Sequence, residues 1–121
     1  MLKQYLKVMK ALSDRTRVKL IKMLQARELC VCEMQATLGL SQPSVSKQLR
    51  VLEEAGLVES RKEGLWMIYR LAEREDSIYA EHLQSMLRQW LNDDREIQEV
   101  VQVASTQNRC DISGRCREGG V

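Results

Sequence analysis

Four cysteines are the residues of this 121-residue chain with the most readily defined chemistry. Cys30 and Cys32 are separated by one residue, and Cys110 and Cys116 lie near the end of the sequence. The first residues contain no apolar stretch of signal-peptide length, so we expect a cytoplasmic protein whose cysteines are thiols. Thiolates prefer soft ions to magnesium or calcium. The cysteines therefore indicate a site for a thiol-seeking metal or metalloid ion.

The backbone around Cys30 and Cys32 decides whether they can bind one ion together. In a regular α-helix, residues two apart point about 200° away from each other, so a helical pair cannot chelate. The sulfur atoms can converge if Cys30 lies on a non-helical lead-in, or if the start of the helix distorts. In the second case, ion binding would bend the helix. The alternative role is that of small buried apolar residues.

The remaining composition argues against an enzyme and against a membrane protein. The chain has one histidine, and it contains no glycine-rich phosphate loop and no nucleophile elbow. We therefore expect no catalytic residues and no organic cofactor. With 44% hydrophobic and 30% charged residues, the composition is typical of a globular domain. No apolar run reaches the roughly 18 residues that a membrane span needs.

Hydrophobic periodicity indicates a mainly α-helical chain with one hairpin. Helices are expected over residues 2–12, 14–24, 31–38, 41–55 and 76–91, with a further helical stretch over 97–104. Two short strands are expected over 57–61 and 66–71. In the second helix we expect the basic side chains to face solvent, namely Arg15, Arg17, Lys19 and Lys22.

Two short helices joined at Gly39 and followed by a hairpin are typical of a winged helix-turn-helix. If Val45, Leu49 and Leu52 face the core, the opposite face of that helix carries small hydroxyls, an amide and cations. Such groups can reach base edges and phosphates. The residues concerned are Ser44, Lys47, Gln48 and Arg50, with Arg61 and Lys62 near the hairpin tip. This pattern favours DNA binding.

Three motifs follow one another in the chain: LSDRTR at 12–17, ELCVCE at 28–33 and SQPSVSKQL at 41–49. With GLV at 56–58 and YRL at 69–71, they resemble the ArsR/SmtB family of bacterial metal-sensing repressors, over about residues 5–91. The resemblance implies a dimeric winged helix-turn-helix, mainly α with a two-stranded β-hairpin wing. It also implies that the 41–49 helix enters the major groove of double-stranded operator DNA, which adds Ser41, Gln42 and Ser46 to the DNA-binding residues.

The same resemblance implies a homodimer formed by the N-terminal helix and the helix over 76–91. Apolar residues on these two helices are the expected interface, namely Leu2, Leu6, Met9, Tyr79, Leu83, Met86, Leu87 and Trp90. We expect residues 1–91 to form the DNA-binding and dimerisation domain. Residues 92–121 are then a helical extension and a flexible, cysteine-bearing C-terminal tail.

The resemblance further implies that Cys30 and Cys32 form a thiolate sensor whose occupation by As(III) or Sb(III) releases the DNA. Arsenite-sensing members often carry a third cysteine one helical turn after the second, where this chain has Gln35. Since As(III) favours three thiolates, we expect Cys110 or Cys116 to supply the missing one. The expected site therefore has two parts, one at a helix start and one on the tail.

Three alternatives remain open. Cd(II)- and Pb(II)-sensing relatives also use paired cysteines here, with further cysteines on an N-terminal arm, whereas this chain has none before Cys30. Tail ligands could still complete a four-thiolate site for Cd(II). A thiol redox switch could instead form a disulfide between Cys110 and Cys116, or between Cys32 and a tail cysteine. Finally, the chain could bind DNA without any small effector.

Overall fold

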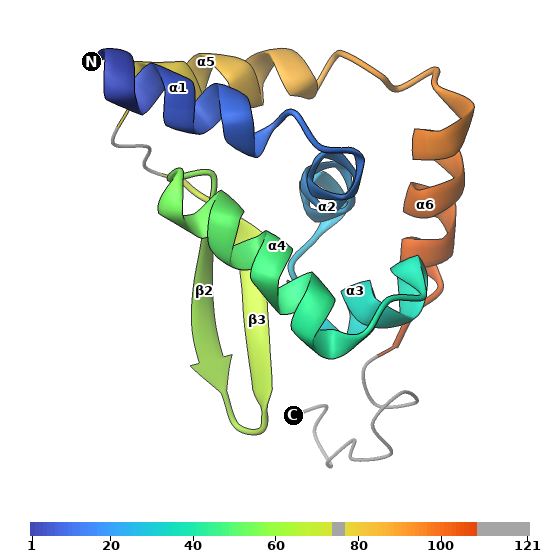
Figure 1. Cartoon of the computed structure of the whole chain (residues 1–121). Coiled ribbons are helices and arrows are strands. Elements are labelled where there is room, and N and C mark those ends of the chain that lie inside the picture. Colours follow the sequence, from blue (N-terminus) through green and yellow to red (C-terminus); the bar gives the residue numbers. More distant parts are fainter. Residues whose placement is uncertain (74–76, 109–121) are drawn as a thin grey trace.

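The computed structural model describes residues 1–73 and 77–108. Its elements are α1 (Leu2–Ala11), α2 (Arg15–Ala26), β1 (Leu29–Cys30), α3 (Val31–Leu38), α4 (Gln42–Glu54), β2 (Val58–Glu63), β3 (Trp66–Leu71), α5 (Ile78–Leu87) and α6 (Arg95–Ser105). Helix α2 lies in the middle, and the β2–β3 hairpin, called the wing below, projects away from the helices (Figure 1). The expected mainly helical winged helix-turn-helix is confirmed, with α3 and α4 as its two helices.

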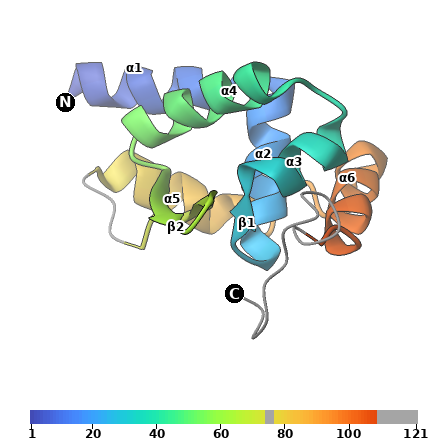
Figure 2. The same ribbon diagram turned by 90° about the horizontal axis from the view of Figure 1, so that it is seen from below.

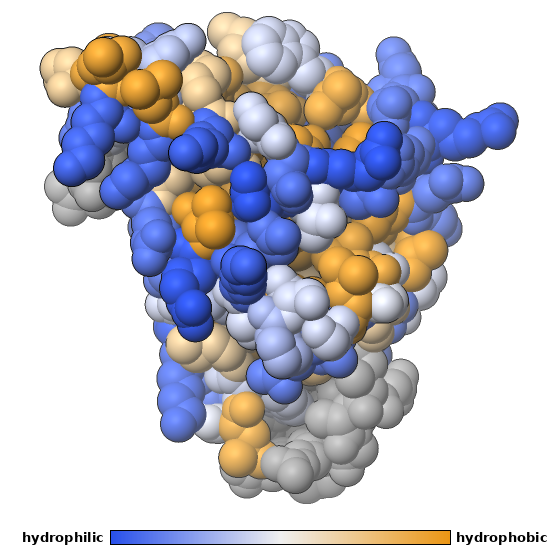
Figure 3. Space-filling view, in the orientation of Figure 1, coloured by the Kyte–Doolittle hydropathy of each residue, from blue (hydrophilic) through white to orange (hydrophobic). Residues whose placement is uncertain are grey.

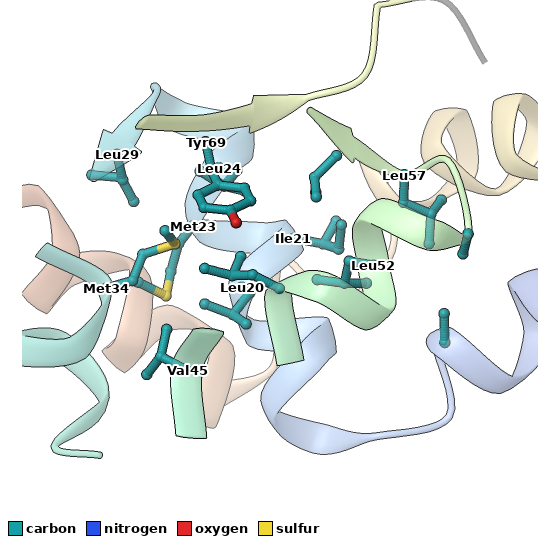
Figure 4. Close-up of a cluster of buried hydrophobic side chains, with 14 of the residues drawn as sticks. Leu20, Ile21, Met23, Leu24, Leu29, Met34, Val45, Leu52, Leu57 and Tyr69 are labelled. Atoms are coloured by element: carbon teal, nitrogen blue, oxygen red, sulfur yellow. The ribbon is translucent and has the colours of Figure 1, made fainter. Parts of the chain in front are cut away.

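The hydrophobic core fills the space between α2, α4 and the sheet (Figure 4). Leu20 and Ile21 of α2 are fully buried there. Val45, Leu49 and Leu52 meet them from α4 and are also fully buried, as the sequence predicted. Burial of this stripe fixes the rotation of α4 about its axis, and thereby determines which of its side chains face outward.

The sheet contains a third strand that sequence reasoning missed. Strand order is β1-β3-β2, all antiparallel, with Leu29 opposite Tyr69 and Cys30 opposite Ile68. A strand of only two residues leaves no period-2 pattern, so it could not be distinguished from a helix lead-in. Its effect on the site is direct, because pairing with β3 holds Cys30 in an extended backbone.

Two expectations were wrong, one about where α5 ends and one about the exposure of Lys22 on α2. Both concern the segment between α5 and α6, called the α5–α6 corner below. Helix α5 ends at Leu87 rather than at residue 91, and Leu91 has a φ of 69°. Lys22, expected in solvent, is only 3% exposed. Its Nζ donates hydrogen bonds to the carbonyl oxygens of Leu87 (2.6 Å) and Trp90 (2.9 Å) and to Oδ1 of Asn92 (2.7 Å). Burial lowers the pKa of Lys22 from its ordinary value. This ammonium group ends α5 by binding its last carbonyls.

Helix α6 lies beside α2 and α3 (Figures 1 and 2). Val100 and Ala104 on α6 join the same hydrophobic cluster as α2. The end of α6 is thereby held close to the start of α3, where the cysteine pair lies. Within the described ranges, no helix is both long enough and apolar enough to cross a membrane.

Candidate thiol site and nucleic-acid interface

Cys30 and Cys32 approach each other from two different elements. Cys30 is the N-cap of α3 in an extended conformation (φ −85°, ψ 163°), whereas Cys32 lies in the first turn of the helix. Their Cα atoms are 5.4 Å apart and their sulfur atoms are joined in a disulfide, where we had expected two thiols. Of the two geometries that allow convergence, the structure therefore has the non-helical lead-in. A pair that can form this bond can, when reduced, also direct both sulfur atoms at one ion.

Glu33 and Arg27 hold the start of α3, and neither was singled out from the sequence. The Cys30 amide donates to Oε1 of Glu33 (2.8 Å), and the Glu33 amide donates to Sγ of Cys30 (3.3 Å). This reciprocal pair is a capping box in which cysteine replaces serine or threonine. The only sequence signal was a glutamate three residues after the N-cap.

Glu33 is 2% exposed, and its carboxylate pairs with Nη1 of Arg27 at 3.1 Å. Nη2 of the same guanidinium donates to the carbonyl oxygens of Ala104 (3.1 Å) and Gln107 (3.0 Å) at the end of α6. Arg27 thus joins the capping box of Cys30 to the segment from which the tail departs.

The other two predicted ligands, Cys110 and Cys116, lie outside the described residues. Within residues 1–73 and 77–108, no group of three histidine, cysteine or acidic side chains could hold a metal ion. The described part of the chain therefore supplies two sulfur donors, and Gln35 stands beside them on the same cavity.

A cavity of about 410 Å³ opens between the cysteine pair, α4 and the wing. Gln35, Ser46 and Arg50 line it from the helices, while Leu65 and Trp66 line it from the wing. The inner wall includes Tyr69, whose pKa is raised by burial and further by the nearby Glu53. The phenol is consequently neutral at physiological pH. The thiol site and the outward face of α4 therefore share one space.

The predicted DNA-binding side chains of α4 and its N-cap lie on one outward face. Lys47 and Arg50 are exposed, as are Ser41, Gln42 and Ser44, whereas Ser46 and Gln48 are half-buried. Ser41 is the N-cap, and its Oγ accepts a hydrogen bond from the Ser44 amide at 3.3 Å. Pro43 has no amide hydrogen and the Ser44 amide is bound to Ser41, so this first turn offers a phosphate the Gln42 amide and the positive end of the helix dipole.

Arg17 was expected in solvent and instead positions a side chain of α4. Its Nη1 donates to Oε1 of Gln48 at 2.6 Å, while Nε and Nη2 donate to the carbonyl oxygens of Ala11 (2.6 Å) and Lys10 (3.0 Å). One guanidinium therefore closes the end of α1 and fixes the amide of Gln48. The Gln48 NH2 group has no hydrogen-bond acceptor among the described residues, so it can donate to a ligand.

The two basic residues of the wing have different surroundings. Arg61 pairs with Glu28 at 2.7 Å and with Glu63 at 3.2 Å, and these carboxylates raise its pKa. Lys62 is exposed and has no ion pair with any residue that the structure describes. It shares a strand face with Ser60, whose Oγ donates to Glu53 of α4 at 2.9 Å. The structure thus places Lys62, but not Arg61, on the α4 side of the wing.

Comparison with known proteins agrees with this arrangement. Residues 14–60 match the family described as "Bacterial regulatory protein, arsR family". Over 104 residues the chain is 33% identical to the arsenical resistance operon repressor of Escherichia coli (strain K12), which spans 85% of this chain and 86% of that protein. The chain belongs to the ArsR family. A Pseudomonas putida arsenic resistance transcriptional regulator, ArsR2, is 40% identical over 90 residues, covering 71% of this chain and 78% of that protein.

Solved structures of similar fold support the same assignment. Reduced HlyU from Vibrio cholerae aligns with a TM-score of 0.61 and 30% identity, over 74% of this chain and 90% of HlyU. The homodimeric winged helix-turn-helix domain of Mb0332 from Mycobacterium bovis aligns with a TM-score of 0.61 and 29% identity, over 72% of this chain and 77% of that domain. As a member of the ArsR family, the chain is a transcriptional regulator and not an enzyme, and its winged helix-turn-helix binds DNA.

Proposed function

We propose that this ArsR-family chain is a homodimeric repressor that releases operator DNA when As(III) or Sb(III) binds Cys30, Cys32 and a tail cysteine. The observation that carries the proposal is the convergence of the two sulfur atoms at the start of α3. They border a cavity whose opposite wall is α4. The names of the E. coli and P. putida relatives support arsenic as the signal.

In the proposed complex, α4 enters the major groove and the wing follows the adjacent backbone. The residues of α4 and its N-cap that would contact DNA are Ser41, Gln42, Ser44, Ser46, Lys47, Gln48 and Arg50. On the wing, Lys62 can contact a phosphate directly. Arg61 can do so only if its ion pairs with Glu28 and Glu63 open.

The proposed dimer interface is an apolar surface on α1 and α5, which lie side by side (Figure 1). Figure 3 shows hydrophobic side chains gathered over the N-terminal end of α1, where Leu2 is 71% and Leu6 54% exposed. Met86 and Trp90 extend this surface, whereas Leu87 of the expected stripe packs into the core. Exposed apolar side chains on two neighbouring helices indicate an interaction site, and the homodimeric M. bovis domain supports a second copy as its partner.

Of the two tail cysteines, we propose Cys110 as the third ligand, from the same subunit. The Gln107 carbonyl is bound by Arg27, which pairs with Glu33 of the Cys30 capping box. Cys110 is three residues after Gln107, and three residues of fully extended chain reach about 10 Å. Cys116 has a longer segment to close, and therefore a larger entropic penalty.

Release of DNA would follow from the double role of Cys30, which is both ligand and N-cap. An ion that fixes the two sulfur atoms of the reduced pair at its own bond lengths and angles would disturb the hydrogen bond from the Glu33 amide to Cys30 Sγ. Because α3 packs against α4, a shift of α3 moves the DNA-binding face. Allosteric coupling of roughly 1–3 kcal/mol corresponds to a decrease in operator affinity of about 5–150-fold.

The test is an arsenite titration of the reduced dimer bound to an operator fragment. We expect Cys30→Ser and Cys32→Ser to abolish release while DNA binding without arsenite is retained. Cys110→Ser should weaken the response more than Cys116→Ser, and adding Gln35→Cys to the variant lacking both tail cysteines should restore it. Unchanged operator affinity at saturating arsenite would exclude arsenic, and parallel titrations with Cd(II) and Pb(II) then test the alternative inducers.

The disulfide between Cys30 and Cys32 favours one second candidate, a thiol redox switch. The partners differ from those expected from the sequence, since Cys32 pairs with Cys30 rather than with a tail cysteine. Oxidation would then act on the same capping box as an ion. Release of the operator by diamide but not by arsenite would favour this function, and release by arsenite alone would exclude it.

Arg17→Lys is expected to lower operator affinity about fivefold, because lysine cannot hold Gln48 and the end of α1 together. Fluorescence anisotropy with a labelled operator measures the change. In the Gln48→Ala background, Arg17→Lys should have little further effect, which separates positioning of Gln48 from general damage. Arg15→Lys is the control, because among the described residues Arg15 pairs with Glu96 on the surface and forms no hydrogen bond with a side chain of α4. Equal effects of Arg17→Lys in both backgrounds would contradict the proposed role.

A further inference from the structure

The cavity beside Cys30 and Cys32 is larger and more apolar on one side than a bare ion requires. Its volume of about 410 Å³ is within the range of small-molecule sites, roughly 300–1,000 Å³. The wing contributes Leu65, Trp66 and Met67, of which Leu65 is 68% and Met67 42% exposed. In Figure 3 a hydrophobic group is visible at the tip of the wing. These side chains present apolar and aromatic surface to whatever occupies the space.

The opposite wall of the cavity belongs to the DNA-binding face. Ser46 and Arg50 of α4 line it, so an occupant would touch residues proposed to contact DNA. The guanidinium of Arg50 can also lie against an aromatic ring, an arrangement that is favourable for an arginine. The cavity can therefore accommodate a flat aromatic group between the wing and Arg50.

The number of sulfur donors points to the same class of ligand. Trivalent arsenic forms three bonds, and the described residues bring two cysteine sulfur atoms together. Inorganic arsenite needs a third thiolate, which we have assigned to the tail. A monosubstituted arsenical already carries a carbon atom in the third position, so two cysteines complete it. Its substituent must then project from the cysteine pair, and the cavity begins there.

We infer that the cavity holds the aromatic substituent of an arylarsonous acid whose arsenic is bonded by Cys30 and Cys32. The inference rests on the proposed role of this cysteine pair as the sensor. The reactive form is the dithiol, which a cellular thiol reductant provides from the disulfide. In the binding step, two S–H bonds and two As–OH bonds break, two As–S bonds form and two water molecules leave. The arsenic remains trivalent throughout.

The experiment compares phenylarsonous acid with arsenite on the full-length dimer, reduced with a phosphine and desalted. Operator release and free thiols are measured for the wild-type chain and for the double variant Cys110→Ser, Cys116→Ser. In the double variant, the concentration of phenylarsonous acid that releases the operator should be within about twofold of the wild-type value. The compound should consume both remaining thiols. The arsenite concentration that releases the operator should be at least about tenfold higher for the double variant than for the wild-type chain. If removal of the tail cysteines weakens the response to phenylarsonous acid as strongly as it weakens the response to arsenite, the inference is overturned.

A second comparison tests the cavity itself and does not depend on operator binding. The affinity ratio of phenyl- to methylarsonous acid is measured for each variant by competition with a small dithiol. Burial of a phenyl ring predicts that Met67→Glu lowers this ratio by about tenfold or more. Val103→Glu should leave it unchanged, because Val103 is equally exposed at 42% but lies on α6 away from the cavity. An unchanged ratio in Met67→Glu would overturn the inference.

The two proposals fail in different ways. If neither arsenical releases the wild-type dimer from its operator, the proposed function is wrong. If arsenite releases it and phenylarsonous acid does not, the proposed function stands and only the cavity inference is wrong.

Discussion

Lys22→Met is expected to lower the free energy of unfolding by about 3 kcal/mol, because it leaves three acceptors without their donor. Lys22 is 3% exposed and its ammonium group binds Leu87, Trp90 and Asn92, so methionine can fill the volume of the side chain but cannot form its hydrogen bonds. The loss is largest at the end of α5, where the chain turns towards α6. Urea denaturation followed by circular dichroism at one fixed protein concentration measures it.

Lys19→Met provides the matched control on the same helix. Lys19 forms an ion pair with Glu96 at 2.7 Å near the surface, and such pairs contribute about 0–1 kcal/mol. If Lys22→Met destabilises the chain no more than Lys19→Met does, the ammonium is not what holds the α5–α6 corner. Because Trp90 belongs to the proposed dimer surface, Lys22→Met should also weaken dimerisation, which sedimentation equilibrium can measure separately.

The helix-turn-helix was predictable because its signals are local. The left-handed Gly39 ends α3, Ser41 begins the next helix, and the spacing of Val45, Leu49 and Leu52 sets its inward face. Each of these signals lies within a few residues of the feature that it determines. The outward face of α4 follows from the inward one by geometry alone.

What sequence reasoning missed depends on contacts between distant segments. Lys22 and Arg17 looked like members of one solvated face, yet both end another helix by binding its carbonyl groups. A long basic side chain can bury its stem and still place its charge on an acceptor, so helical periodicity cannot predict its exposure. Strand β1 and the ion pair of Arg61 with Glu28 also require a partner far away in sequence.

The cysteine site was predictable in part from local signals, and in part it depends on a contact with a distant segment. Spacing alone showed that Cys30 and Cys32 can converge only if the helix is interrupted or begins between them. The pairing of Cys30 with Ile68 of β3 then selects the geometry in which Cys30 lies on a non-helical lead-in. As a result, the residue that would bind the effector is also the residue that begins α3, and the cavity beyond it reaches α4. Effector chemistry and DNA binding are thus separated by one short helix.

Lys47→Ala is expected to reduce operator affinity roughly 30-fold at 0.15 M salt, and to reduce the salt dependence of binding as well. The side chain is exposed on the DNA-binding face of α4 and has no ion pair within the described residues. Each lost phosphate contact removes about 0.9 from the slope of log affinity against log salt. In a homodimer one substitution removes two contacts, so the slope should decrease by about 1.8.

Arg61→Ala is the control that separates the loss of a phosphate contact in Lys47→Ala from the loss of a positive charge in general. The same single charge is removed, but from a guanidinium already paired with Glu28 and Glu63 on the other face of the wing. The slope should therefore change much less than in Lys47→Ala. Anisotropy titrations between 0.05 and 0.3 M salt, roughly the range in which counterion release dominates, give both slopes. A decrease of about 0.9 for Lys47→Ala would mean that only one α4 helix contacts DNA, and equal slopes for both variants would contradict the proposed orientation of the wing.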